Sequence, residues 1–308
     1  MAALPVKGTP WGAIEVADAH MHFFSPAFFA AVEKEKGSGD VASQLGWDQP
    51  ATPEALADRW VAELDKHQVS RSMLIASIPN DTSSIGAAIA THPDRFSGVY
   101  MTNPTLPAAD IKLEAAFRED GVRGIFLFPS MHRYSLHDSH VRSLVQVVAG
   151  HPGAFVYVHC GALTIGFRKK LALPCRFDTR CSNPIDLQLL ATDFPRVNFV
   201  IPHFGSGYFR EALMLAHLCP NVYLDTSSSN SWMAWQPGNL TLPDIFRQAL
   251  RVVGPQRLLF GSDSSFFPRG WVGKIFDDQL RALAEIGADA ETARAVFGGN
   301  LMRLLANN

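Results

Sequence analysis

Four histidines and one aspartate stand at the ends of apolar runs, where hydrophobic packing alone does not account for them. In VADAHMHFFSP, residues 16–26, His20 and His22 are one residue apart. Side chains two apart on a strand point to the same face, so both rings can face one site while Met21 packs on the other side. Three further runs end in the same way: FVYVHCG in His159, NFVIPHFGSG in His203 and RLLFGSDSSF in Asp263.

These side-chain types indicate metal binding if the runs converge. Taken singly, the pair of histidines could be packing, His159 or His203 a hydrogen-bonded core residue, and Asp263 the cap of the next helix. Taken together, three or four imidazoles and one carboxylate suit a borderline divalent cation. We therefore expect one divalent metal, Zn²⁺ by preference, although Mn²⁺, Fe²⁺ and Co²⁺ occupy similar sites.

The elements that must position these residues follow a β/α alternation. Apolar stretches predict eight strands, at 14–20, 69–77, 96–103, 122–128, 154–160, 197–203, 222–226 and 257–263. Amphipathic stretches predict helices at 53–67, 83–92, 108–120, 139–150, 184–193, 207–218, 242–253, 272–286 and 290–305. Parallel strands need such crossovers. Eight units favour a closed (β/α)8 TIM barrel over a doubly wound sheet, which would carry GxGxxG after its first strand.

Barrels of this kind place their chemistry at the carboxyl ends of the strands. Two connections are too long for plain turns, 23–52 after the first strand and 161–183 after the fifth. Both lie on the active-site side, where long loops are usually functional. We find no interdomain linker or repeat beyond the alternation, so residues 1–308 are expected to form a single α/β domain.

Composition narrows the class of ligand. The chain has 308 residues, 47% of them hydrophobic, and 27 Lys and Arg against 29 Asp and Glu. This balance gives no basic surface for nucleic acid and no polybasic stretch for a membrane. We find no apolar export segment, no stretch of about 18 apolar residues and no CxxC pair. A cytoplasmic enzyme with a small-molecule substrate is expected; its oligomeric state stays open, with a homodimer the commonest assembly.

The set D-x-H-x-H, VHCG, PHFGSG and GSD resembles the amidohydrolase superfamily, specifically its amidohydrolase-2 branch. Further stretches extend the resemblance over roughly residues 14–305, among them LDKHQVSRSMLIAS, DGVRGIFLFPS and FGGNLMRLL. The resemblance implies a distorted (β/α)8 barrel and a metal-dependent hydrolase or non-oxidative decarboxylase. It also implies that His20, His22, His159 and Asp263 hold the metal.

The same resemblance gives roles to two further positions: His203 would be a further ligand or an acid/base partner, and Asp18 would support the ligands from behind. Metal-activated water needs a base to take its proton, and Asp263 would fill that role. Binuclear relatives carry a carboxylated lysine on the fourth strand. This chain has Phe126 in the corresponding run GIFLFPS, which predicts a single metal.

Substrate contacts are harder to assign. The loop after the fifth strand is basic, and Arg176 and Arg180 could bind a carboxylate, because the guanidinium fork matches its two oxygens. Phe128 and Trp271 could contact an apolar part of the substrate. A solvated loop and aromatic anchors are the ordinary alternatives for all four.

The first functional hypothesis is hydrolysis of an ester, lactone or amide of a small carboxylated compound by metal-activated water. The alternative is decarboxylation of an aromatic or muconate-like acid, which needs the same ligands. A metal-free lactonase that uses Asp263 alone and a barrel retained only for binding stay open. Cysteine and serine nucleophiles are disfavoured, because Cys160 should face away from His159 and no GxSxG is present.

Overall fold

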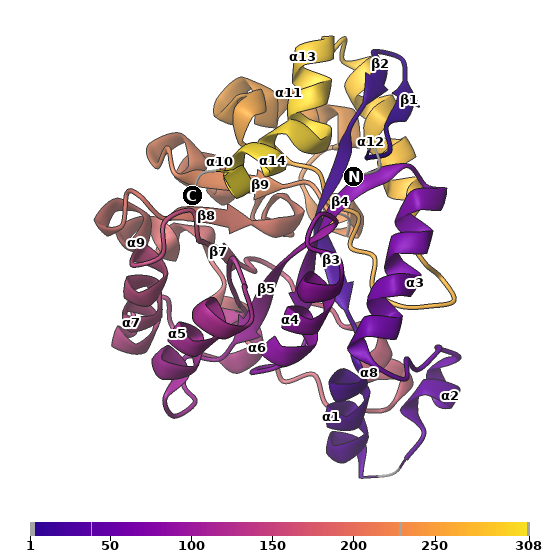
Figure 1. Ribbon diagram of the computed structural model, residues 1–308. Helices are drawn as coiled ribbons and strands as arrows, with labels where there is room; N and C mark the ends of the chain where they lie inside the picture. Colours follow the sequence, from indigo (N-terminus) through magenta and orange to yellow (C-terminus); the bar gives the residue numbers. More distant parts are fainter. Residues whose placement is uncertain (1–3, 38, 228–229, 307–308) are drawn as a thin grey trace.

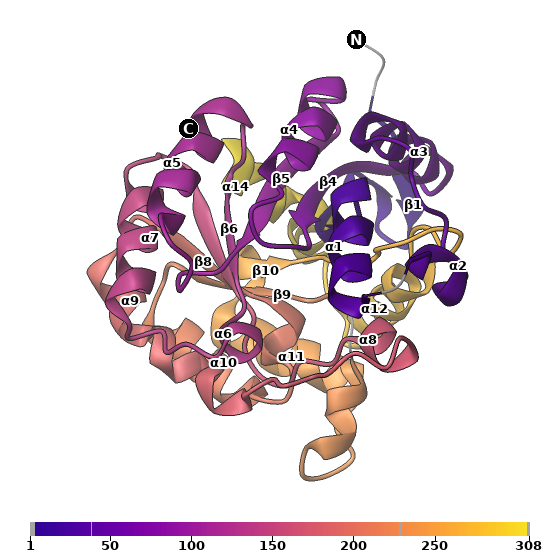
Figure 2. The same ribbon diagram turned by 90° about the horizontal axis from the view of Figure 1, so that it is seen from below.

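The computed structural model describes residues 4–37, 39–227 and 230–306. Eight parallel strands lie in one sheet in chain order, and helices surround them (Figures 1 and 2). The strands are β3 (Val16–Phe23), β4 (Val69–Ala76), β5 (Phe96–Thr102), β6 (Gly124–Leu127), β7 (Phe155–Val158), β8 (Asn198–Ile201), β9 (Val222–Asp225) and β10 (Leu258–Leu259). The predicted (β/α)8 architecture is confirmed.

The sheet closes through the segment that follows β10. The N–H of Ala19 donates to the carbonyl of Phe260 at 2.7 Å, and the N–H of Asp263 donates to that of His20 at 2.9 Å. Met21 and Ser264 form a parallel bridge. Closure therefore places the histidine pair of β3 beside Asp263, although 243 positions of sequence separate His20 from Asp263 and 241 separate His22 from it.

The outer helices match the predicted crossovers. They are α3 (Pro53–Lys66), α4 (Thr82–Thr91), α5 (Ala109–Glu119), α7 (Ser139–Ala149), α9 (Gln188–Asp193), α10 (Phe209–Leu218), α11 (Leu242–Val253) and α12 (Gly273–Glu285). The chain then forms α13 (Ala290–Arg294), the π-helical turn η6 (Ala295–Gly299) and α14 (Asn300–Ala306). Some helices begin with proline after a capping side chain, as at Ser25 and Thr52, which fixes where the loop ends.

Shorter elements occupy the connections. They are the helices α6 (Pro129–His132) and α8 (Gly166–Lys170) and the 3-10 turns η1 (Thr179–Cys181), η2 (Pro184–Leu187), η3 (Pro202–Gly205), η4 (Asn230–Trp235) and η5 (Pro255–Arg257). An antiparallel hairpin, β1 (Lys7–Thr9) with β2 (Gly12–Ile14), precedes the barrel. Sequence periodicity did not predict it, because three residues are too few to show alternation.

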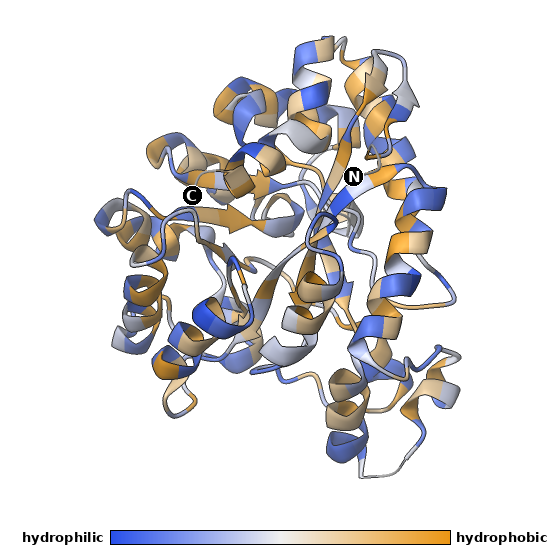
Figure 3. Ribbon diagram, viewed as in Figure 1, coloured by the Kyte–Doolittle hydropathy of each residue, from blue (hydrophilic) through white to orange (hydrophobic). Residues whose placement is uncertain are grey.

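Alternation along the strands separates an inner from an outer apolar layer. Ile75 and Phe126 belong to the cluster inside the barrel, whereas Leu74 belongs to the cluster between strands and helices. Figure 3 shows the same apolar character along the strands. In β3 the pairing passes from Asp18↔Ser72 to Met21↔Leu74, a bulge of one extra residue. Beyond the bulge Met21 lies in the outer layer, as predicted, and the neighbouring histidines face inward.

The two long connections form a cap over the carboxyl ends of the strands. The first carries α1 (Pro26–Lys36) and α2 (Val41–Leu45), and the second carries α8. Their apolar side chains build a separate cluster that includes Phe28, Trp47 and Leu171. Figure 1 shows α1, α2 and α8 together beyond the barrel. Within the described part of the chain, no helix has the length and apolarity to cross a membrane.

Candidate metal centre

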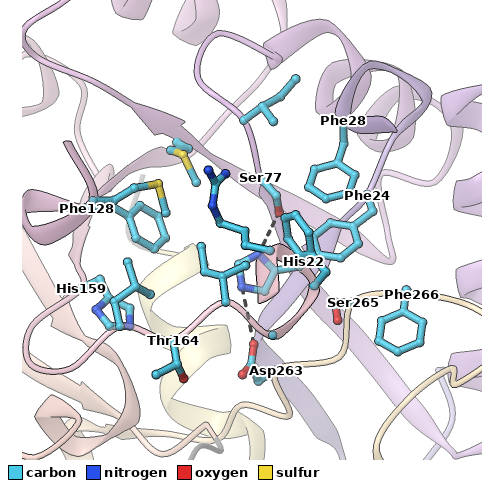
Figure 4. Close-up of a pocket in the computed structure, with 18 of the residues that line it drawn as sticks. His22, Phe24, Phe28, Ser77, Phe128, His159, Thr164, Asp263, Ser265 and Phe266 are labelled. Atoms are coloured by element: carbon cyan, nitrogen blue, oxygen red, sulfur yellow. Dashed lines mark hydrogen bonds and ion pairs between the residues drawn. The ribbon is translucent and has the colours of Figure 1, made fainter. Parts of the chain in front are cut away.

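Three of the predicted ligands converge where the barrel closes. One donor atom from each of His20, His22 and Asp263 lies within 4.8 Å of the others. An oxygen of Asp263 is 3.7 Å from Nε2 of His20 and 3.5 Å from Nε2 of His22 (Figure 4 shows the second pair). Two ligand atoms at about 2.1 Å from one tetrahedral ion are about 3.4 Å apart. The spacing therefore fits a shared cation better than direct hydrogen bonds.

Hydrogen bonds set the tautomers of the two rings. Nδ1 of His20 donates to Asp225 at 2.6 Å, and Nδ1 of His22 lies 2.8 Å from the Ser77 hydroxyl, which itself donates to the carbonyl of Ile75. With the proton on Nδ1, each Nε2 carries the lone pair. Nε2 of His20 is buried and has no hydrogen-bond partner among the described residues. These donors fit a divalent cation.

Burial keeps the two imidazoles neutral. Desolvation lowers the pKa of His20 to about 3 and holds the pKa of His22 well below its usual value. Burial has the opposite effect on Asp263: desolvation raises the pKa of its carboxyl group to about 8. The charge of Asp225 adds to this increase, and the charge of Arg269 opposes it. In the cation-free site Asp263 thus keeps its proton at pH 7, and a cation must displace that proton to bind.

His203 lies at the same site, in a left-handed conformation (φ 57°) directly after β8. Its Nδ1 donates to the carbonyl of Ser227 at 3.0 Å, so the neutral ring carries its lone pair on Nε2. Burial lowers its pKa to about 4. The ring centroid is 4.9 Å from that of His20. The geometry leaves both predicted roles open, ligand and proton acceptor.

His159 lines the same cavity but stands outside the three-residue group. Its ring lies 5.3 Å from that of His203 and stacks on Phe128 at 5.5 Å. Its Nδ1 is buried without a hydrogen-bond partner among the described residues. A second unpaired imidazole nitrogen at this cavity agrees with a fourth ligand, which stays a prediction.

Asp225 is a site residue that sequence reasoning missed. It ends β9 in the stretch NVYLD, the same pattern of a polar residue closing an apolar run that identified the others. Its fully buried carboxylate accepts from Nδ1 of His20 and from the N–H of Ser227. The Ser227 hydroxyl lies 3.1 Å from Nδ1 of His20 and 3.0 Å from Nδ1 of His203. The end of β9 therefore orients both rings.

Gly261 allows this arrangement to be compact. A Cβ at this position would lie 2.7 Å from the Cβ of His20 and 2.7 Å from the Cβ of Ser227. Such distances are shorter than real contacts, so any larger residue would push β3 and the end of β9 apart. The glycine of the GSD stretch is thus required by close packing beneath the site.

Asp18 lies behind the cluster, as predicted. It accepts from the N–H groups of His20 and Ser262, each at 3.0 Å, and from Nε1 of Trp271 at 2.7 Å. Desolvation raises its pKa to about 6, against these hydrogen bonds. The prediction that Trp271 contacts substrate is wrong: its indole is buried in the outer layer against Phe276 and does not line the cavity.

The arginines proposed for the substrate are also misplaced. Arg176 and Arg180 are exposed and do not line the cavity, and Arg180 forms an ion pair with Asp178 at 2.7 Å. The basic composition of the loop could not show which of its faces meets the cavity. Among the described residues the cations that do line it are Arg168, Lys170 and Arg269, and Arg168 pairs with Glu35.

The cavity has a volume of about 710 Å³ and reaches from the metal cluster to the cap. Phe126 and Phe128 line it, as expected for Phe128. Phe126 occupies the inner face of β6, and its side chain offers no donor atom to a cation. Among the described residues, the single group able to hold a cation is the one around Asp263.

Comparison with known proteins gives a match to a family model. The family model Amidohydro_2, described as amidohydrolase, matches residues 17–306. Protein fluG of Emericella nidulans is 39% identical over 87 residues, which are 28% of this chain. The match spans only 10% of the length of that relative.

Solved structures share the fold at low identity. The 5-carboxyvanillate decarboxylase LigW of Sphingomonas paucimobilis is 15% identical, with a TM-score of 0.63 over 96% of this chain and 100% of that one. A zinc-bound amidohydrolase of Burkholderia multivorans is 18% identical, with a TM-score of 0.63 over 96% of this chain and 100% of that one. A probable 2-pyrone-4,6-dicarboxylic acid hydrolase of Acinetobacter baumannii is 16% identical, with a TM-score of 0.61 over 95% of this chain and 99% of that one.

Proposed function

Because the chain belongs to the amidohydrolase family and is a hydrolase or a related carboxy-lyase, we propose that it hydrolyses an ester, lactone or amide of a small carboxylated compound with one divalent cation. The observation that carries this proposal is the convergence of His20, His22 and Asp263 within 4.8 Å. The unpaired, buried Nε2 of His20 supports it, because a neutral imidazole needs an electrophilic partner there.

These three residues would hold the cation, with His159 as the fourth ligand that the family pattern implies. Zn²⁺ is proposed because imidazole nitrogen and carboxylate oxygen are its usual ligands. A cation of this kind lowers the pKa of water to about 7 and polarises a carbonyl oxygen.

Two side chains of the protein would move or orient protons. Asp263, once ionised, accepts the proton of the attacking water at a carboxylate oxygen and later returns it to the leaving group. His203 is neutral with its proton on Nδ1, so its Nε2 accepts a hydrogen bond from water or from a substrate hydroxyl. A neutral ring held in this way does not donate to the scissile carbonyl, which makes His203 an orienting group or proton acceptor.

Decarboxylation of an aromatic or muconate-like acid is the second candidate. The rings of Phe126 and Phe128, stacked 4.3 Å apart on the cavity wall, favour a planar substrate. In this reaction the bond between the ring carbon and the carboxylate breaks, CO₂ leaves, and the carbon takes a proton. Asp263 would give the carbon a proton that it has first accepted from water or from a substrate hydroxyl, since the cation displaces its own.

A substrate panel separates the two reactions. Zinc-loaded protein is incubated with esters, lactones and amides of small carboxylic acids and with aromatic and muconate-like acids, and both ring opening and CO₂ release are followed. We expect hydrolysis that falls at least about 100-fold in chelator and returns with Zn²⁺. CO₂ release with the esters and lactones intact would contradict hydrolysis in favour of decarboxylation. Full activity in chelator, with less than about a tenth of an equivalent of metal bound, would contradict the cation.

A further inference from the structure

Stacked aromatic rings form two opposite walls of the cavity. On the side of β3 and the cap, the rings of Phe28, Phe24, Trp47 and Phe266 follow one another, with centroid separations of 4.0, 5.5 and 4.1 Å. The corresponding interplanar angles are 4°, 22° and 15°. We call these four residues the cap stack. Its rings come from three separate segments, yet they lie nearly parallel and all line the cavity.

The facing wall comes from β6 and the end of β7. Phe126, Phe128 and His159 stack at 4.3 and 5.5 Å with angles of 24° and 21°. β3 and β7 are four strands apart in the closed eight-stranded order, so they stand on opposite sides of the barrel. Figure 4 shows Phe128 and His159 on one side, Phe24, Phe28 and Phe266 on the other, and His22 and Asp263 between them. Such a space fits a flat, unsaturated group.

Arg269 continues the cap stack. Its guanidinium carbon lies 4.4 Å from the ring centre of Phe266. One Nη donates to the Ser265 hydroxyl at 2.7 Å and to the carbonyl of Asp263 at 3.3 Å, which holds the group beside the metal cluster. Arg269 has no ion-pair partner among the described residues, whereas Arg168 is paired with Glu35. It is therefore a positioned cation with donors left for an anion.

Resting on the proposed function, we infer that Arg269 binds a carboxylate of the substrate and thereby selects ring-bearing anionic compounds. The ring lies between the two stacks, its scissile group reaches His20, His22 and Asp263, and its carboxylate accepts from the guanidinium. Because one Nη of Arg269 donates to the carbonyl of Asp263, the guanidinium lies next to a residue that would hold the cation. Arg269 thus takes the role that Arg176 and Arg180 cannot fill.

Binding of two matched probes tests this inference. The affinities of 2-naphthoate and its uncharged isostere 2-naphthamide are measured by calorimetry for the wild type, Arg269→Gln, Arg269→Lys and the exposed control Arg176→Gln. We expect Arg269→Gln to weaken 2-naphthoate about 10- to 100-fold and to leave 2-naphthamide unchanged. Arg269→Lys should lie between, since it keeps the charge and loses the fork. Arg176→Gln should match the wild type.

The ring contacts have their own control. Phe128→Leu should weaken both probes alike, by about 2- to 10-fold, because it removes stacking from either. Unchanged binding of 2-naphthoate to Arg269→Gln, or an equal loss for both probes, would overturn the role of Arg269. A loss seen with Lys170→Gln and not with Arg269→Gln would move the anion site to Lys170 and overturn it too.

Repeating the titrations with and without Zn²⁺ separates this inference from the proposed function. If binding of 2-naphthoate requires zinc and is unchanged in Arg269→Gln, the carboxylate binds the cation. The role of Arg269 is then wrong, while the metal site is supported. If Arg269→Gln selectively loses affinity for 2-naphthoate but the protein binds no zinc, the anion site at Arg269 is supported and the metal-dependent function is contradicted.

Discussion

Asp263→Asn should lower kcat/KM for the substrate found in the panel by about 10³-fold or more, without changing the fold. The amide is neutral and cannot accept the proton of the attacking water, and it is a weaker ligand than a carboxylate. Asn is the appropriate replacement because residue 263 has φ 58°, and Asn tolerates the left-handed region better than Ala. Activity, bound zinc and melting temperature are measured together.

The exposed Asp193→Asn, which removes a surface carboxylate of α9, serves as the control and should behave as the wild type. The free energy of unfolding of Asp263→Asn should stay within about 1 kcal/mol of the wild type in the absence of metal. Retained activity would show that Asp263 is neither base nor essential ligand. A collapse of the fold would assign the residue a structural role instead.

Asp225→Asn should raise the dissociation constant for Zn²⁺ about 10- to 100-fold, although Asp225 is not in the ligand group. Its carboxylate accepts from Nδ1 of His20 at 2.6 Å, which fixes the tautomer and increases the electron density at Nε2. An amide of the same size keeps the packing and loses the charge. Competition with a chromophoric chelator measures the affinity, and the exposed Asp193→Asn is again the matched control.

Unfolding of the metal-free protein distinguishes this electrostatic role from a packing role. Desolvation raises the pKa of Asp225 from 3.8 to about 6, so the folded state holds this proton more tightly than the unfolded state does. Its ionisation therefore lowers the free energy of unfolding as the pH rises from about 4 to about 6. Asp225→Asn lacks this contribution, so its free energy of unfolding relative to that of the wild type should increase from about pH 4 to about pH 6. If the two proteins show parallel changes of stability with pH and equal zinc affinity, the electrostatic role of Asp225 is contradicted.

The fold was predictable because each barrel strand is an apolar run between amphipathic helices, and those patterns are local. Closure was predicted from the number of β/α units, but the pairing that makes it was not, because it depends on hydrogen bonds between β3 and residues 260–264, and β10 itself has only two residues. The bulge in β3 could not be predicted from the sequence either, since it arises from the pairing of β3 with β4. The hairpin β1–β2 is too short for its alternation to be read.

Whether a site residue could be predicted from the sequence also depends on the element that carries it. His20, His22 and Asp263 were predictable because strand ends fix where their side chains point. Asp225 carries the same signal, a polar residue that closes the apolar run NVYLD. Arg176, Arg180 and Trp271 were assigned wrongly because they lie in loops, where composition does not determine which face meets the cavity. Arg269 follows Asp263 by six residues, and only the folded loop brings it back to the site.

Diffraction from zinc-soaked crystals at the zinc absorption edge tests the metal centre most directly. One anomalous peak is predicted per chain, about 2.0–2.2 Å from Nε2 of His20, Nε2 of His22 and an oxygen of Asp263. A peak elsewhere, two peaks in the cavity, or no peak in excess zinc would show that these side chains do not share a single cation.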